Sequence, residues 1–153
     1  MNTNNKPQIL FVDDDVFFAN GYLEALDERY QVTIARNVPT AEQEVKTVTK
    51  HLCAVLDVMM PIPASWPDGD KIAAAGGALT GIIVLRRCKV EIVNAKLPVI
   101  VLTNRQPIEM EAEIANLGFP NGLVEIHHKI VTPAFMLPNL MRDIIKRIKN
   151  VTT

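Results

Sequence analysis

The chain has 153 residues, of which 48% are hydrophobic, and its formal net charge is -1. This length and composition predict a single domain over residues 1–153 that is large enough to bury a hydrophobic core. The near-neutral charge gives no basic surface for nucleic acid, and no apolar run is long enough for a signal peptide or a membrane span, so we expect a cytoplasmic protein without membrane contact.

The first part of the chain alternates strand and helix patterns. Residues 8–12 consist of Gln8 and a continuous apolar run, typical of a buried parallel strand, and lead directly into three aspartates at 13–15. Apolar positions at helical spacing predict a helix over 16–28, and a short strand follows over 31–35. Pro39 fits the first turn of a helix that extends to about residue 50.

A second apolar run ends in a single acid. Residues 53–56 lead into Asp57, and Pro61 follows shortly after. This pattern predicts a strand buried on both faces that delivers Asp57 to the edge of a sheet. Prolines and glycines then interrupt residues 62–80, which we predict to be an irregular insertion. Its composition favours a partly ordered lid near Asp57, with the single Trp66 packing the segment onto the domain.

The last part of the chain continues the alternation. We predict a helix over 81–94, a strand over 99–102 that ends at Thr103, and a helix between Pro107 and Gly118. A strand over 123–126 is followed by Lys129. Thr132 and Pro133 fit the start of a final helix, whose apolar stripe faces the core.

Five strand-helix units in succession predict an α/β fold: a single doubly wound five-stranded parallel sheet with helices on both faces. The carboxyl ends of parallel strands meet at one edge of the sheet, where ligands bind in such folds. The side chains expected at this edge are those of Asp13, Asp14, Asp57, Thr103 and Lys129. The sequence therefore predicts one site built from several strand ends.

These residue types suit phosphoryl transfer. Three neighbouring carboxylates repel one another unless a cation lies among them, and hard oxygen ligands favour Mg2+. A magnesium ion that keeps most of its waters leaves Asp57 free to act as a nucleophile. Lys129 and Thr103 would then supply a positive charge and a hydroxyl donor to the phosphoryl oxygens.

The chain resembles the receiver domains of two-component response regulators, in the stand-alone, chemotaxis-regulator-like form of the flavodoxin-like fold. The resemblance rests on the motifs at 9–15, 55–61 and 99–103 and on Lys129. It implies that Asp57 is the phosphoacceptor and Thr103 the switch hydroxyl, and that Lys129 pairs with the phosphoryl group. The implied Mg2+ ligands are Asp13, Asp14, Asp57 and the main-chain carbonyl of Met59.

The resemblance also implies partners. The phosphoryl donor would be a histidine kinase or a histidine phosphotransfer protein, and an unknown downstream protein would bind the phosphorylated form. The sequence ends soon after the final predicted helix, so we expect the output to pass through another protein. The chain would then be a phosphorelay signalling domain rather than a dedicated enzyme.

Two positions depart from the family pattern at the end of the predicted sheet. The residue after Thr103 is usually small and is here Asn104, which would crowd or hydrogen-bond the phosphoryl pocket. The usual switch aromatic is replaced by Ile126, which leaves the coupling between hydroxyl and aromatic ring in question.

Two further departures concern the backbone. Ile130 stands where a proline, often after a cis bond, usually follows the lysine, and a trans bond is expected because a non-proline cis bond costs about 2.5 to 4 kcal/mol. The path from Pro61 to Gly81 is also much longer than in the family, which inserts residues beside Asp57.

Two other hypotheses fit part of the sequence pattern. One is a degenerate receiver, a binding module that keeps the fold but is not phosphorylated. The other is a haloacid-dehalogenase-like phosphatase in which Asp13 is the nucleophile. The second lacks an acidic pair after the lysine and leaves Asp57 without a role.

Overall fold

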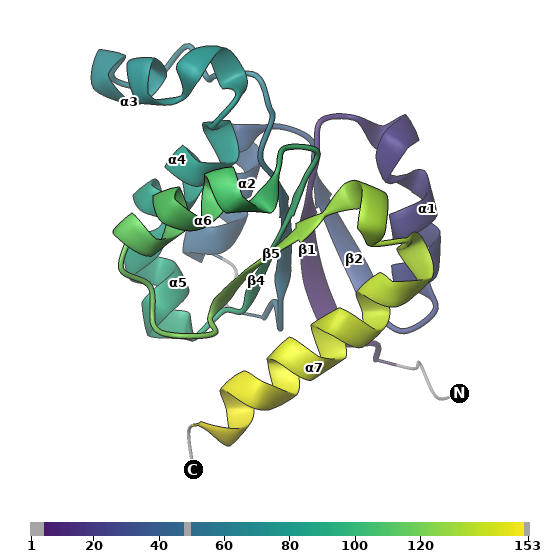
Figure 1. The fold of residues 1–153 in the computed structure, drawn as a ribbon. Helices are drawn as coiled ribbons and strands as arrows, with labels where there is room; N and C mark the ends of the chain where they lie inside the picture. Colours follow the sequence, from purple (N-terminus) through teal and green to yellow (C-terminus); the bar gives the residue numbers. More distant parts are fainter. Residues whose placement is uncertain (1–4, 48–49, 152–153) are drawn as a thin grey trace.

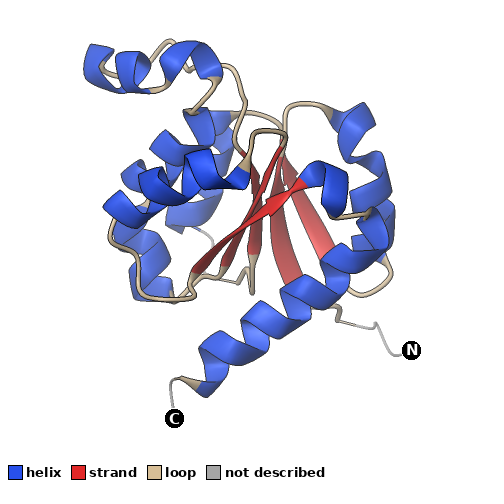
Figure 2. Cartoon of the chain, viewed as in Figure 1, coloured by secondary structure: helices blue, strands red, loops and turns tan. Residues whose placement is uncertain are grey.

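The computed structural model describes residues 5–47 and 50–151, which form one five-stranded parallel sheet. The strands are β1 (Gln8–Val12), β2 (Gln31–Ala35), β3 (Ala54–Asp57), β4 (Val99–Thr103) and β5 (Val124–His128). They lie in the order β2-β1-β3-β4-β5, and each neighbouring pair is parallel. Helices cover both faces (Figures 1 and 2), so the predicted fold class is confirmed.

The two faces of the sheet pack against different helices. Alternate residues of β1 point to opposite sides: Ile9 and Phe11 join one buried cluster, and Leu10 and Val12 join the other. The first cluster is covered by α1 (Val16–Asp27) and α7 (Leu137–Asn150). The second is covered by α2 (Val38–Thr47), α4 (Thr80–Arg87), α5 (Lys89–Ala95) and α6 (Pro107–Asn116). The sheet is therefore buried from both sides, and its carboxyl edge remains accessible.

Two predicted boundaries were wrong, and a third falls beside residues outside the described part. The helix expected over 81–94 is divided at Cys88 into α4 and α5. The helix expected to reach residue 50 is described as far as Thr47, and residues 48–49 lie outside the described part. β5 begins at Val124 and continues to His128, because pairing with β4 extends beyond the apolar residues that marked the strand in the sequence.

The final helix begins later than predicted. Pro133 precedes a short 3-10 turn, η3 (Ala134–Met136), and another turn, η2 (Lys129–Val131), directly follows β5. The α-helix itself begins at Leu137, which places Pro138 at its first residues. A proline is tolerated there because the first amides of a helix have no intrahelical acceptor.

The insertion is more regular than predicted. Residues 62–80 contain a helix, α3 (Asp68–Ala73), and a 3-10 turn, η1 (Ala75–Gly77). Asp68 and Asp70 lie in the first turn of α3, where acidic side chains interact favourably with the helix dipole. α3 lies beyond the end of α4, at the upper left of Figure 1. Trp66 packs into the core with 4% of its surface exposed, as predicted.

The structure also describes the cysteines and the character of the helices. Cys53 and Cys88 are both buried and unpaired. Among the described residues, no helix has the length and apolar character needed to cross a bilayer. Residues 1–4, which belong to the polar N-terminal stretch, lie outside the described part.

Candidate functional site

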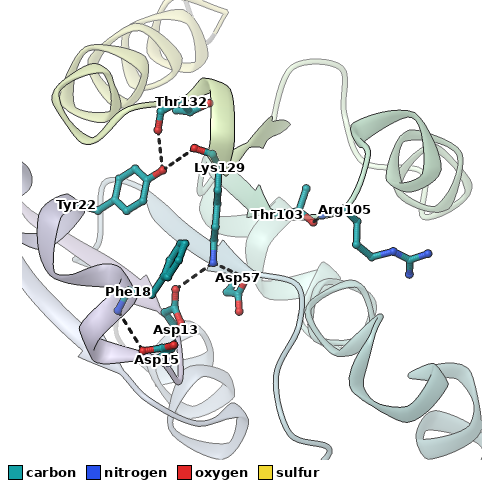
Figure 3. Close-up of polar contacts among 9 residues, drawn as sticks. All are labelled: Asp13, Asp15, Phe18, Tyr22, Asp57, Thr103, Arg105, Lys129 and Thr132. Atoms are coloured by element: carbon teal, nitrogen blue, oxygen red, sulfur yellow. Dashed lines mark hydrogen bonds and ion pairs between the residues drawn. The ribbon is translucent and has the colours of Figure 1, made fainter.

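The carboxyl edge of the sheet brings together three predicted residues from three strand ends (Figure 3). Asp13 follows β1, Asp57 ends β3 and Lys129 follows β5. The Lys129 ammonium donates a hydrogen bond to Asp57 Oδ1 at 3.0 Å and lies 3.4 Å from Asp13 Oδ2. One buried lysine therefore bridges two carboxylates that are distant in the sequence.

The loop after β1 holds its acids in place through local hydrogen bonds. The Asp13 carboxylate accepts the Asp15 N–H at 2.9 Å, and the Asp15 carboxylate caps α1 by accepting the Phe18 N–H at 3.1 Å. N-cap aspartates satisfy amides that the helix leaves without a partner. The start of α1 thus fixes the position of the acidic loop relative to the sheet.

The electrostatics of the site favour binding of a cation. The pKa of Asp57 is raised to about 6: burial is the largest cause, the Lys129 charge acts against it, and the neighbouring Asp13 charge adds to it. Burial also raises the pKa of Asp13. For Lys129, burial lowers the pKa, but the charges of the two aspartates outweigh burial and raise it overall. The lysine therefore remains charged while the buried carboxylates are incompletely neutralised.

The carboxylates also form a set of oxygen donors that fits Mg2+. One oxygen from each of Asp13, Asp14 and Asp57 lies within 4.8 Å of the others. Asp13 and Asp57 are buried, whereas Asp14 is exposed to solvent. Hard carboxylate oxygens with access to water are the environment in which Mg2+ keeps a partial hydration shell. The three residues can therefore hold a magnesium ion.

A cavity of about 250 Å³ opens at this cluster. It is lined by Asp13, Asp14, Asp15, Phe18, Asp57, Met59, Asn104 and Lys129. Asn104 therefore borders the cavity, as its position after Thr103 predicted. No residue of the insertion lines it, so the prediction of a lid over Asp57 was wrong. The insertion is instead joined to α4: Asp70 of α3 forms ion pairs with both Arg86 and Arg87.

Thr103 lies at the same sheet edge but not in the cavity lining. Its side chain is fully buried, and its hydroxyl accepts the Arg105 N–H at 2.9 Å. Because the oxygen is the acceptor in that bond, the hydroxyl proton can still be donated elsewhere. The structure thus places Thr103 at the sheet edge but outside the cavity lining.

Two aromatic residues at the site were missed by the sequence analysis. The Phe18 ring lies 5.3 Å from Lys129 Nζ, within range of a cation-π interaction. The Tyr22 hydroxyl donates to the Thr132 carbonyl at 2.6 Å and lies 3.4 Å from the Lys129 carbonyl. Both residues fit an ordinary helix pattern, so no local signal distinguished them. Together they support the lysine from the α1 side (Figure 3).

The residues around Lys129 form local contacts, and the bond that follows the lysine is trans, as predicted. His127 contacts Glu125, and the ring of His128 accepts the Ile130 N–H, so neither histidine lies in the acidic cluster. The bond between Lys129 and Ile130 is trans. The lysine is therefore presented without the cis bond that often accompanies it in the resembled family.

No protein-family profile and no curated protein matches the sequence. Solved structures do match. The receiver domain of the Francisella response regulator 1452 is 22% identical and has a TM-score of 0.68, with 93% of this chain and 98% of that chain covered. A CheY-like receiver domain protein from Methanospirillum hungatei JF-1 is 19% identical with a TM-score of 0.65, covering 95% and 98% of the two chains.

A receiver domain protein from Clostridium thermocellum is also similar, at 20% identity and a TM-score of 0.67, covering 94% of this chain and 98% of that chain. These matches extend over nearly the whole of both chains, and the parallel sheet of this chain has the strand order β2-β1-β3-β4-β5. The chain therefore has the fold of the CheY-like response-regulator receiver domains.

Proposed function

We propose that the chain is a phosphoacceptor receiver of a two-component phosphorelay. The observation that carries the proposal is the environment of Asp57. This carboxylate ends a buried strand, is paired with the Lys129 ammonium at 3.0 Å and lies beside two further carboxylates. Such a cluster combines a nucleophile, a positive charge and a cation site within one cavity.

In the proposed reaction an Asp57 oxygen attacks the phosphorus of a phosphohistidine on the donor protein. The bond from phosphorus to the imidazole nitrogen breaks, the imidazole leaves with the bonding electron pair, and an acyl phosphate forms on Asp57. Lys129 neutralises a phosphoryl oxygen, and the Thr103 hydroxyl donates to another the proton that its bond with the Arg105 N–H leaves free. Bound Mg2+ would supply further charge neutralisation, held by Asp13, Asp14, Asp57 and the Met59 carbonyl.

An exposed apolar surface beside the site supports a protein as the phosphoryl donor. Phe17 is 97% exposed and precedes Phe18, which lines the cavity. Ile130 and Val131, directly after Lys129, are also largely exposed. Exposed apolar side chains that neighbour the residues of a polar site are typical of interaction surfaces. We propose that a histidine kinase or phosphotransfer protein contacts them.

The phosphorylated form would signal by binding another protein and not by a dedicated enzymatic activity. Ile126 stands at the position of the usual switch aromatic residue, and it is half-buried on β5. Asn104 at the cavity provides a different group that can contact a phosphoryl oxygen through its amide. We propose Asn104 as part of the readout.

Incubation with acetyl phosphate and Mg2+, followed by intact mass measurement, tests the proposal. The unmodified chain should gain one phosphoryl group, and Asp57→Asn should gain none. Asp143→Asn, which alters an exposed carboxylate on α7, is the matched control and should be labelled normally. Labelling that persists in Asp57→Asn but is lost in Asp13→Asn would support the phosphatase reading. Absence of labelling with acetyl phosphate and with phosphohistidine donors would support the degenerate receiver.

A further inference from the structure

The end of the insertion returns to the loop that follows Asp57. The Thr80 hydroxyl donates to the Met60 carbonyl at 2.7 Å, and the Gly81 N–H donates to the Val58 carbonyl at 2.8 Å. Thr80 is fully buried. A β-carbon at residue 81 would collide with the main chain of Asp57 and Val58, so only glycine permits this approach.

These two bonds occupy the carbonyls on either side of Met59. Within the described part of the chain, no hydrogen bond to the Met59 carbonyl is found, and Met59 lines the cavity beside the three carboxylates. The Thr80 oxygen also lies 3.3 Å from the Gly77 carbonyl, but its single proton serves the shorter bond to Met60. The loop is therefore anchored at Val58 and Met60 and leaves the intervening carbonyl available.

A clamp on α4 holds the insertion against the domain. Arg87 lies 2.6 Å from both Asp70 in α3 and Glu42 in α2, and its guanidinium stacks 5.2 Å from the Trp66 ring. Arg86 adds a second bond to Asp70. Trp66 is buried beneath this group. Trp66 and Asp70 belong to the first part of the insertion, and Arg87 belongs to α4, which begins at Thr80. The clamp therefore ties the insertion to the helix that carries Thr80.

We propose that Thr80 is a positioning residue for the metal site: its hydroxyl fixes the Met60 peptide and thereby holds the Met59 carbonyl ready for the cation. This inference rests on the proposed function, in which that carbonyl is a metal ligand. The insertion then acts on the site from behind the β3 loop and not as a cover over the cavity. Loss of the hydroxyl leaves the Met60 carbonyl buried without a partner, and the loop shifts to satisfy it.

Mn2+ binding to the full chain tests this inference, with the free ion counted by electron paramagnetic resonance and Mg2+ used as competitor. Thr80→Val keeps the shape of the side chain and removes the hydroxyl, so Mn2+ should bind about three- to tenfold more weakly. Thr80→Ser restores the hydroxyl and should restore the affinity. Thr47→Val is the matched control, because the Thr47 hydroxyl also donates to a carbonyl at 2.7 Å but lies on α2.

The outcomes separate the inference from the proposed function. Absence of Mn2+ binding by the unmodified chain would contradict the metal site itself. Normal affinity in folded Thr80→Val, with only a lowered Tm, would show a purely structural role and overturn the inference alone. If Thr80→Val does not fold, Asp70→Asn loosens the clamp at the surface and should weaken Mn2+ binding about twofold. Unchanged affinity in that variant would equally overturn the inference.

Discussion

Two clusters of acidic and basic side chains lie on this domain, and they differ in charge balance and burial. At the sheet edge, three carboxylates face one ammonium, and two of those carboxylates and the ammonium are buried. At the clamp, Asp70 and Glu42 face Arg86 and Arg87 near the surface. The first cluster has surplus negative charge, whereas the second is balanced.

The pKa values follow this difference. At the sheet edge, burial raises the pKa of Asp57 to about 6. At the clamp, slight desolvation opposes the shift, but hydrogen bonds from Arg87 and Arg86 lower the pKa of Asp70. A folded domain therefore stabilises the charge of Asp70 and destabilises the charge of Asp57. A carboxylate whose ionised form is destabilised in a cavity is typical of a functional site. A balanced group of ion pairs is typical of a structural one.

Among the residues that the structure describes, Lys129 supplies the one ammonium bound to the sheet-edge carboxylates, and removing it should have the largest effect. Lys129→Met in EDTA should lower the free energy of unfolding by about 2 to 3 kcal/mol at pH 8, because buried Asp13 and Asp57 lose their counter-charge. At pH 5 the loss should be smaller, since the pKa of Asp57 rises further without the lysine and the carboxyl becomes neutral. Urea unfolding at both pH values measures this. Lys146→Met, on the exposed face of α7, is the control, and an equal loss at both pH values would contradict the electrostatic cause.

Neutralising one acid in each cluster should change stability in opposite directions. Asp57 has a folded-state pKa above its ordinary value, so its ionisation destabilises the fold as the pH rises from about 4 through 6. Asp57→Asn should therefore stabilise the metal-free chain by about 1 to 3 kcal/mol at pH 8, and this gain should vanish below pH 4. Asp70→Asn should instead destabilise it. Thermal unfolding in EDTA distinguishes the two, and a gain in stability from both variants would remove the contrast drawn here.

Weakening the clamp should have the smallest effect on global stability. Arg87→Ala removes two partly exposed ion pairs and the contact with Trp66, which together contribute about 1 kcal/mol. Because Trp66 is the single tryptophan, its emission should shift to longer wavelength as water reaches the ring. The control is Arg142→Ala, because the exposed Arg142 guanidinium pairs with the adjacent Asp143. This variant should leave the free energy of unfolding and the Trp66 emission unchanged. A Trp66 spectrum insensitive to Arg87→Ala would mean that the insertion is held by other contacts.

Much of the fold and part of the site could be predicted from the sequence. Each buried strand is a continuous apolar run, and the acids at 13 and 57 come directly after two of these runs. Strand direction in a parallel sheet then brings their ends together, which correctly placed Asp13, Asp57 and Lys129 in one cluster. The insertion was harder to predict, because its prolines and glycines suggested an irregular segment and masked a short helix at Asp68–Ala73.

The sequence by itself determined the order of strands and helices along the chain, because that order depends on local periodicity. It also determined which acids lie at the strand ends, because parallel strands share one direction. Only the tertiary structure decided that Tyr22 reaches the Thr132 carbonyl, 110 residues away, and that Thr80 binds the Met60 carbonyl. It also decided that the Thr103 hydroxyl accepts the Arg105 N–H and does not line the cavity. Such contacts depend on how whole elements pack and on which buried groups need a hydrogen-bond partner, and no periodic pattern in the chain records either.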